Sequence, residues 1–512
     1  MRAPAAFTSP LEASIYVEGL RARPAFFVGL FLLLHAAMWT IAAWFSNPTP
    51  DPQLAIAHAL GREWQLGYVD SPPLAPWVFE IFYRLGRLPL GYALGPLTVA
   101  LAGWLVFLFA RRIVGDRHGA LAVFLMVGVH PVAFPVASFD SDLLQMPLVA
   151  LAVLAWWRAV TERNRAAWIA LGVTCGLLAY AGVQWVFVLA TLVFITATSE
   201  TGRAALRTQE DVFSAVLALF IFMLLLTPRM IWLQDHGFAG VTMGIDLALA
   251  SSSLTTATGV ALAVIFGHIG LLLLFLLGSS VHATDGDIAP VFMRPDLTRF
   301  ARWTAILIAI MPALLAFAAT YFPGIRYPTS AAAPLLLYSG LLAIVLSPQA
   351  LRVHRQRTVA VAGLTLLLLP PLLEISLAFV SPWIGEARAT NWPAGDASRY
   401  ITDVYRTRTG RRLEYVVGDL ATASSIAILS RDQPGVFIDA DSNRAPWVDR
   451  AKVESVGGVV VWRMRGADAS PPPAMAANLP PLVSEAPLVL RWVRSGGLDF
   501  TRLGWAIIPP KP

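Results

Sequence analysis

The chain has 512 residues, of which 57% are hydrophobic and only 14% are charged. Charged residues make up about 25% of an ordinary globular domain, so this composition argues strongly against a water-soluble protein. The net charge of +6 does not indicate nucleic-acid binding, because most basic residues lie in short segments between apolar stretches. The single cysteine, Cys175, lies within an apolar stretch and excludes a disulfide framework and a thiolate metal site.

Apolar stretches of about 17–25 residues, long enough to cross about 30 Å of hydrocarbon, recur from residue 26 to about residue 380. They predict an α-helical polytopic membrane protein with about eleven spans. We expect the spans at residues 25–45, 94–110, 118–137, 142–157, 166–181, 184–198, 212–232, 257–278, 303–320, 329–347 and 358–381. The first apolar stretch is longer than the region of about 7–15 residues in a cleaved signal peptide, so we expect this span to remain in the protein.

Arginines are distributed unequally between the two sets of loops that these spans define. One set contains Arg111, Arg112, Arg117, Arg158, Arg163, Arg165, Arg203, Arg207, Arg294, Arg299, Arg352, Arg355 and Arg357. The opposite set contains only Arg62, Arg84, Arg87 and Arg326 before the tail. The positive-inside rule therefore predicts a cytoplasmic N-terminus, and an odd number of spans places the C-terminal tail on the opposite side of the membrane. In a bacterial inner membrane, which is the location we expect, that side is the periplasm.

The tail is richer in charged residues and in proline, and its apolar runs are only as long as strands. Residues 413–417, 436–438 and 459–462 are typical of buried strands, and residues 421–429 are typical of an intervening helix. We therefore expect a membrane domain at residues 1–381 and a small α/β extramembrane domain at residues 382–512. The tail contains no glycine-rich phosphate loop and no nucleophile elbow, which favours a packing or partner-binding role over catalysis.

The periplasmic loop after the first span, residues 46–93, is long and mixed in polarity. Asp51 followed by Pro52 is a helix start signal, and a second surface helix is expected at residues 74–85. Two such interfacial helices would form a roof over a cavity at the membrane surface. A carboxylate in that position can act as a general base, so Asp51 is the first catalytic candidate. The alternative is that Asp51 is only a solvated helix cap.

A second acidic cluster, Asp140 and Asp142, lies where the third span turns into the fourth. Two carboxylates beside hydrocarbon are unfavourable unless they face a cavity or find partners, so both are catalytic candidates. The alternative is that Ser141 or Asp142 caps the fourth span.

A cavity of this kind suits a lipid-linked sugar donor, whose phosphate would require positive groups at the same depth as the carboxylates. Arg229, near the outer end of the seventh span, is the principal candidate, and Arg326 and Arg62 also face outward. For Arg229 the alternative is an arginine that extends to the membrane interface. His236 and His58 lie on the same side, but no HxH or HxxxH spacing accompanies them, so the metal site is unknown and a divalent cation stays possible as a cofactor. His268 and Glu374 are ionisable groups within spans eight and eleven.

Four stretches resemble glycosyltransferase family 39 in its broad bacterial sense, which includes lipid A aminoarabinose transferases, rhizobial lipopolysaccharide galacturonosyltransferases and, more distantly, protein O-mannosyltransferases. The stretches are Asp51 with Tyr68, Asp70, Pro72-Pro73-Leu74 and Trp77; Asp142 with Trp156-Trp157-Arg158; residues 168–178; and residues 228–238. The resemblance covers about residues 20–380. It implies a GT-C fold, a polyprenyl-phosphate sugar donor and catalysis at the outer membrane face. It also implies that Asp51 is the base or orients the acceptor, and that Asp142, or else Asp140, is the second acidic residue.

The sequence departs from the family pattern at three places. Pro52 stands where a Glu commonly follows the first Asp, Ser71 stands where a Lys precedes Pro-Pro, and Ala179-Tyr180 replaces a Ser-Lys pair. The lost lysines remove phosphate contacts, which leaves arginines such as Arg229, together with Tyr68, Asp70 and His236, as candidate substrate-binding residues.

The leading hypothesis is a glycosyltransferase that moves a sugar from a polyprenyl-phosphate donor to an envelope acceptor. That acceptor is lipid A or core lipopolysaccharide, another glycan or a protein. The expected partners of such a glycosyltransferase are membrane lipids, the donor and the acceptor, and no nucleic acid is expected. A transporter or flippase of lipid-linked sugars is the first alternative, although the sequence has no convincing internal repeat. A catalytically degenerate assembly subunit is the second.

Overall fold

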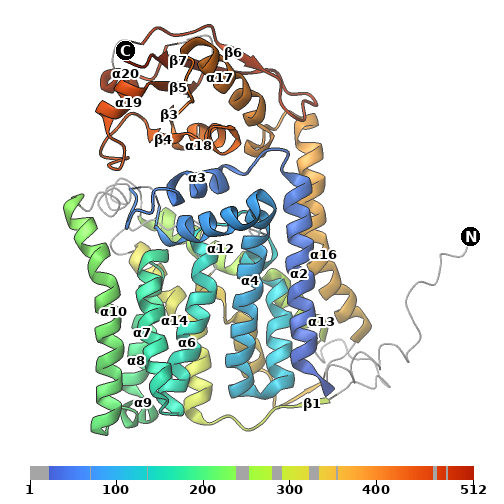
Figure 1. Ribbon diagram of the computed structural model, residues 1–512. Coiled ribbons are helices and arrows are strands. Elements are labelled where there is room, and N and C mark those ends of the chain that lie inside the picture. The colour runs from blue at the N-terminus through green and yellow to red at the C-terminus, as the bar shows by residue number, and fades with distance from the viewer. Residues whose placement is uncertain are drawn as a thin grey trace, which may run out of the picture.

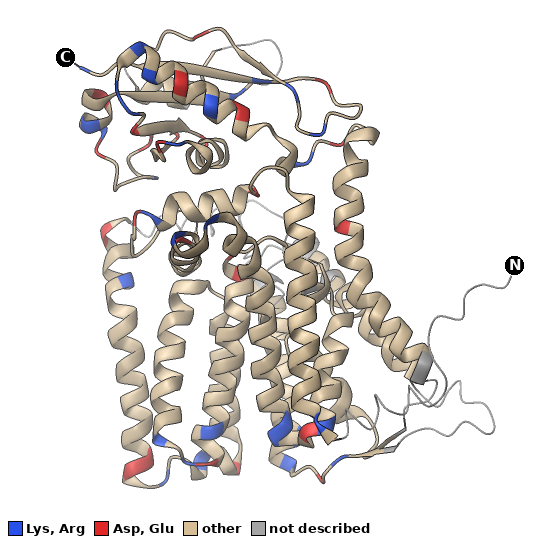
Figure 2. Ribbon diagram, turned by 45° about the vertical axis from the view of Figure 1, so that its right-hand side comes forward, with Lys and Arg blue, Asp and Glu red and all other residues tan. Residues whose placement is uncertain are grey.

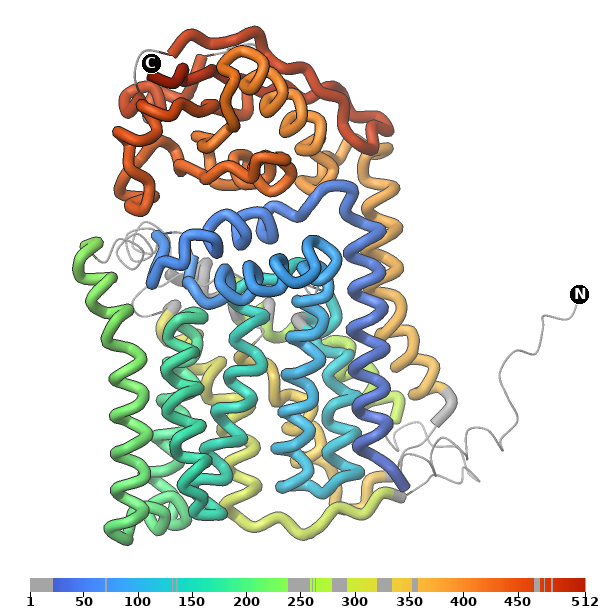
Figure 3. Tube along the Cα trace, viewed as in Figure 1, coloured from blue at the N-terminus to red at the C-terminus, as the bar shows by residue number. Residues whose placement is uncertain are grey.

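The computed structural model describes residues 22–69, 71–134, 137–237, 253–278, 291–321, 334–352, 356–464, 470–479 and 482–511. A bundle of long helices forms one end of the molecule, two short helices lie across its end, and an α/β unit lies beyond them (Figures 1 and 3). We call the short helices the roof and the α/β unit, from residue 394 to residue 511, the cap. The predicted helical membrane fold with a small C-terminal sheet is confirmed.

The bundle contains helices of very different length. The helices are α2 (Pro24–Ser46), α4 (Leu74–Leu125), α5 (His130–Ala133), α6 (Ser141–Thr161), α7 (Arg165–Ala181), α8 (Trp185–Thr198), α9 (Glu200–Ala204), α10 (Gln209–Asp235), α12 (Ser253–Gly267), α13 (Ile269–Gly278), α14 (Arg299–Tyr321), α15 (Ser339–Leu346) and α16 (Gln356–Val380). Short 3-10 turns are η1 (Met126–Gly128), η5 (Pro334–Leu336), η6 (Ser381–Ile384) and η7 (Ala389–Asn391). Strands β1 (Val291–Met293) and β2 (Ala350–Arg352) pair antiparallel.

Six helices among the described residues are long and apolar enough to cross a membrane, namely α2, α4, α6, α10, α14 and α16. The other predicted spans correspond to the shorter helices α7, α8, α12 with α13, and α15, so the predicted number of eleven is not confirmed. Helix α4 contains two predicted spans, because Gly115 adopts a φ of 79° that reverses the chain inside it. A positive φ is accessible to glycine without steric cost.

The roof consists of α3 (Pro52–Gly61) and the first part of α4, which ends at a kink where Gly86 and Arg87 leave helical geometry. Both surface helices predicted for this loop therefore form. Helix α3 lies between the bundle and α18 of the cap (Figure 1). Its Ala59 and Leu60 belong to the hydrophobic core of the cap, whereas Leu54 and Ala55 pack toward α4. The short helix thus contributes apolar side chains to two cores.

The cap is built on a five-stranded sheet with the strand order β4-β3-β5-β7-β6. The strands are β3 (Tyr415–Gly418), β4 (Gly435–Ile438), β5 (Gly458–Arg463), β6 (Leu488–Leu490) and β7 (Thr501–Ile508), and the helices are α17 (Ala394–Thr409), α18 (Leu420–Leu429), α19 (Arg450–Val456) and α20 (Pro473–Asn478). Strands β3, β4 and β5 are parallel, and β7 pairs antiparallel with β5 and β6. The three predicted strands and the predicted helix are confirmed; β6 and β7 were not predicted.

Charged side chains gather at the end of the bundle opposite the cap (Figure 2). Arg112 and Arg158 both pair with Glu162, and Arg165 pairs with Glu210. These pairs connect α4 with α6 and α7 with α10, and they include three of the thirteen arginines expected in the cytoplasm. The orientation across the membrane stays a prediction.

Candidate functional site

A cavity of about 380 Å³ lies beside the start of the roof helix α3, close to the ends of spans α2 and α16. Its walls come from three separated parts of the chain: the loop between α2 and α3, the segment before α6, and the end of α16 with the segment that follows. The lining residues are Asn47, Asp51, Phe134, Ala137, Ser138, Asp140, Glu374, Arg388, Ala389 and Thr390. The cavity thus brings together three carboxylates and one guanidinium.

Asp51 both caps a helix and lines the cavity, so its position as a cap does not exclude the predicted catalytic role. It is the N-cap of α3, where its carboxylate accepts a 2.8 Å hydrogen bond from the backbone N–H of Gln53. It also lines the cavity. Burial raises the pKa of Asp51 above its ordinary value, in spite of the hydrogen bond from Gln53. A carboxylate with a raised pKa is a stronger base, so this position suits proton abstraction.

Asp140 lies in the same cavity and caps α6, since its carboxylate accepts a 2.9 Å bond from the N–H of Leu143. The cap of this helix is therefore Asp140, and the expectation of Ser141 or Asp142 as the cap was wrong. Burial, followed by the charge of Asp142, raises the pKa of Asp140 to about 6. Asp51 also contributes to this shift, which places the two carboxylates within electrostatic reach of each other.

Asp142 belongs to a different network, between α6 and the start of α8. Its Oδ1 accepts from the side-chain amide of Gln184 at 3.1 Å and from that of Gln145 at 3.4 Å. The two amides are joined by a 2.6 Å bond from Gln145 to Gln184. The backbone of Gly182 packs directly against Gln145, where a larger residue would collide with the amide. Asp142 therefore connects helices beside the cavity and is not among the residues that line it.

Arg229 contacts the loop that follows α3, residues 62–69, which we call the roof loop. It is not among the residues that line the cavity. Its guanidinium donates a 2.9 Å bond to the carbonyl of Leu66 and lies over the ring of Tyr180 at 5.8 Å. His236, one turn after Trp232, stacks on that indole at a ring distance of 4.1 Å. The backbone of Gly67 packs against the other side of Trp232. These contacts fasten residues 62–69 to the end of α10.

Arg62 and Tyr68 connect the roof loop to the cap. Arg62 donates a 2.6 Å bond to the carbonyl of Gln433, and the hydroxyl of buried Tyr68 donates to the carbonyl of Leu60 at 2.6 Å. The ring of Tyr68 meets Trp447 of the cap edge to face at 5.4 Å. Neither residue lines the Asp51 cavity. The remaining two candidates, Asp70 and Arg326, lie outside the described residues.

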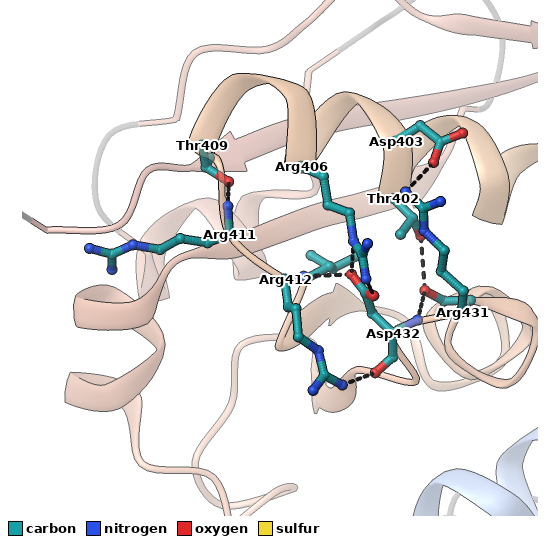
Figure 4. Close-up of polar contacts among 10 residues, drawn as sticks. Thr402, Asp403, Arg406, Thr409, Arg411, Arg412, Arg431 and Asp432 are labelled. Carbon is teal, nitrogen blue, oxygen red and sulfur yellow. Dashed lines mark hydrogen bonds and ion pairs between the residues drawn. The ribbon is translucent and has the colours of Figure 1, made fainter.

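The loop that presents Gln433 to the roof is held by Asp432, whose side chain is fully buried. Figure 4 shows its carboxylate against the guanidinium of Arg406 from α17. The same carboxylate accepts a 2.9 Å bond from the N–H of Leu413, just before β3. Arg412 donates to the backbone carbonyl of Asp432 at 3.3 Å. These contacts of Asp432 position the loop through which the cap meets the roof.

A buried hydrogen bond between His58 and Glu80 joins the two helices of the roof. Nδ1 of His58 donates to Glu80 at 2.8 Å, and Arg84 donates to the other oxygen of the same carboxylate at 2.7 Å. Burial lowers the pKa of His58, although the Glu80 carboxylate opposes this shift. The sequence analysis named His58 but missed Glu80, although its spacing of four from Arg84 is typical of a helical ion pair.

Glu374 and Arg388 form an ion pair on the cavity wall. The sequence analysis noted Glu374 as an ionisable group in the last span, but it did not identify Arg388. No motif marks Arg388, which lies in a short segment between the last span and the cap. Within the described residues, no three His, Cys, Asp or Glu side chains are grouped closely enough to bind a metal ion. A divalent cation stays a prediction of the sequence.

The comparisons with known proteins concern the fold. The family model described as dolichyl-phosphate-mannose-protein mannosyltransferase matches residues 70–232. No curated protein sequence matches the chain. Among solved structures, ArnT from Cupriavidus metallidurans, determined with undecaprenyl phosphate bound, aligns with a TM-score of 0.59 and 14% identity over 95% of this chain and 99% of that chain.

A second structure, the mycobacterial arabinofuranosyltransferase AftD, aligns with a TM-score of 0.47 and 15% identity over 94% of this chain and 41% of that chain. The family match and the alignment with ArnT together confirm the resemblance predicted from the sequence. The chain is a multi-pass membrane protein of the GT-C type.

Proposed function

We propose that the protein is a glycosyltransferase that takes a sugar from a polyprenyl-phosphate donor and transfers it to an envelope acceptor on the periplasmic side of the inner membrane. The observation that carries the proposal is the position of Asp51, a half-buried carboxylate with a raised pKa that lines the cavity where the roof meets the bundle. The GT-C fold and the undecaprenyl phosphate bound to the similar ArnT structure support the choice of donor.

The proposed site solves a solubility problem of such a donor. The prenyl chain stays in the bilayer, whereas the phosphate and the sugar need polar groups and water. A cavity at the end of the spans, beside the start of α3, offers both environments. Because the protein around the cavity is less polarisable than water, charges in it interact more strongly than in bulk solvent.

In the proposed reaction, Asp51 accepts the proton of the acceptor hydroxyl, and the resulting oxygen attacks the anomeric carbon of the donor sugar. The bond between that carbon and the phosphate oxygen breaks, and polyprenyl phosphate leaves with the electron pair. A single displacement inverts the anomeric carbon. Asp140 shapes the pocket around Asp51, and the charge of Glu374 favours the protonated form of Asp51 once the proton has been taken up.

The test is transfer of radiolabelled sugar from a panel of polyprenyl-phosphate donors in membranes, comparing wild type with Asp51→Asn at matched expression. We expect the variant to lose at least about 100-fold in rate, the lower part of the range for general-base catalysis. Asp396→Asn is the matched control, because Asp396 is exposed on α17 and pairs only with Arg399. The labelled product identifies the acceptor.

Two outcomes would contradict this proposal in different ways. Equal transfer by wild type and Asp51→Asn would remove the assignment of the base. Movement of intact lipid-linked sugar across the membrane, without covalent transfer to any acceptor, would support a transporter instead.

A further inference from the structure

Arg388 reaches the cavity from a part of the chain far from Asp51 in sequence. It lies in the segment between η6 and η7, directly after the last span α16. Among the residues that line the cavity in the described part of the chain, it is the only one with a permanent positive charge. An anionic group that enters this cavity therefore meets one guanidinium and three carboxyl groups.

The guanidinium of Arg388 is held from one side. Its Nη2 donates to the carboxylate of Glu374, and its Nη1 lies 3.4 Å from the backbone carbonyl of the same residue. Both acceptors belong to α16, so the arginine is anchored on a single helix. A guanidinium has five N–H donors, and these contacts leave donors available for a ligand. The side chain is 29% exposed, which is consistent with a free edge toward the cavity.

The segment that carries Arg388 is also fixed relative to Asp51. The carbonyl of Thr390 accepts from both the backbone N–H and the hydroxyl of Thr49, at 3.2 and 2.6 Å. Thr49 precedes Asp51 by two residues. The side chain of Asn391 bonds the backbone of Arg494 on both its donor and its acceptor side. The distance between base and guanidinium is therefore set by several hydrogen bonds rather than by a loose loop.

We propose that Arg388 binds the phosphate of the lipid-linked donor, with Glu374 holding the guanidinium in position. The inference rests on the proposed function and identifies the part of the donor that this wall of the cavity recognises. A planar guanidinium binds phosphate oxygens through two parallel hydrogen bonds, which a point charge does not do.

The same residue assists the chemical step. When the bond between the anomeric carbon and the phosphate oxygen breaks, the phosphodiester with one negative charge becomes a phosphomonoester that gains a second. The electron pair stays on the departing phosphate oxygen, beside the guanidinium. Since this charge develops in the transition state, a fixed positive group there lowers the barrier. Arg388 is then both a binding residue and a stabiliser of the leaving group.

The test measures binding of undecaprenyl phosphate to the purified full-length protein in detergent, with undecaprenol as the lipid that lacks the phosphate. We compare wild type, Arg388→Gln, Arg388→Lys and Glu374→Gln. Arg399→Gln is the matched control, because Arg399 is exposed on α17. A charge-assisted hydrogen bond contributes about 1.5–3 kcal/mol, so we expect Arg388→Gln to bind the phosphate about 10- to 100-fold more weakly. Undecaprenol binding is expected to stay unchanged.

Arg388→Lys keeps the charge, so we expect it to lose less affinity for undecaprenyl phosphate than Arg388→Gln. If the glutamine variant does not fold, the lysine variant still tests the proposal. Glu374→Gln is expected to weaken phosphate binding without affecting undecaprenol. If wild type prefers undecaprenyl phosphate and both Arg388 variants bind it equally well, Arg388 is not the phosphate ligand, while the transferase proposal stands. If wild type does not distinguish the two lipids, this proposal falls, and the sugar-transfer assay decides the proposed function separately.

Discussion

The hydroxyl of Thr49 donates a 2.6 Å hydrogen bond to the carbonyl of Thr390 and so ties the loop before Asp51 to the segment after Arg388. Thr49 follows the first span α2, and Thr390 follows the last span α16. Their contact therefore links the part of the cavity wall that carries Asp51 to the part that carries Arg388.

Arg494 is expected to stabilise this junction. It donates to the carbonyls of Phe45 and Ser46 at 2.7 and 2.8 Å, at the end of α2, and its guanidinium lies 4.1 Å from the ring of Phe379. Replacing Arg494 with Ala leaves these carbonyls without their partner, and we expect a loss of about 1–3 kcal/mol. Thermal unfolding in detergent measures it. Arg491→Ala is the control, since this exposed side chain has a single hydrogen bond, to Ser495, within the described part of the chain. Equal effects of both variants would contradict the prediction.

Asp140 is expected to make stability depend on pH. Burial raises its pKa from 3.8 to about 6, so between these values the folded protein binds more protons than the unfolded chain. Stability contributed by this carboxyl group is therefore present below about pH 4 and decreases as the pH rises to about 6. Asp140→Asn keeps an N-cap acceptor for α6. Its unfolding temperature, measured from pH 4 to pH 7, should fall less steeply than that of wild type, and parallel curves would refute the argument.

Gly61→Ala is expected to separate the roof helices. A methyl group at this position would overlap the backbone carbonyl of Pro76 and approach Cβ of Glu80 at 2.8 Å. Because a backbone carbonyl cannot rotate away, α3 must shift from α4, at a cost of about 1–3 kcal/mol. We expect a lower unfolding temperature and slower sugar transfer. Gly395→Ala in α17 meets no atom within 4 Å and should leave both unchanged.

Asp432 is expected to be essential for the cap. Its buried carboxylate pairs with Arg406 and accepts from the buried N–H of Leu413, and leaving a buried donor without its acceptor costs about 1–3 kcal/mol (Figure 4). We expect Asp432→Ala to increase hydrogen exchange in β3 and in the loop that carries Gln433. Asp403→Ala removes an exposed pair with Arg431 and should change stability by about 0–1 kcal/mol. If hydrogen exchange in both regions is unchanged in Asp432→Ala, the contacts of Asp432 are dispensable for the cap.

Much of the fold could be predicted because its signals are local. Apolar length marked the long spans, the Asp-Pro pair marked the start of α3, and short apolar runs marked β3, β4 and β5. Strands β6 and β7 were missed. In β7, only alternate positions such as Leu503 and Trp505 are large and apolar, and Gly504 interrupts the pattern where it packs on Trp462. Its place in the sheet depends on pairing with β5, which no local pattern reveals.

Less of the candidate site than of the fold could be predicted from the sequence. Asp51 and Asp140 were identified because an acidic residue beside a span is unusual. For arginines the residue type alone does not distinguish a ligand contact from a structural one. Arg229 and Arg62 both bond backbone carbonyls, of Leu66 and Gln433 respectively. Which carbonyl or cavity lies opposite a long side chain depends on the packing of distant segments, and Arg388 was missed for the same reason.

The position of α3 has a consequence for the order of biogenesis. Leu60 and Tyr68, near the beginning of the chain, are buried in the hydrophobic core that the last hundred residues build. During synthesis these side chains emerge long before β5 and β7. The apolar surface of the first loop therefore stays exposed until these last strands have been synthesised and the cap can fold. Closure of the roof is therefore one of the last events of folding, and a chain whose synthesis stops after α16 has its spans but an unfinished cavity.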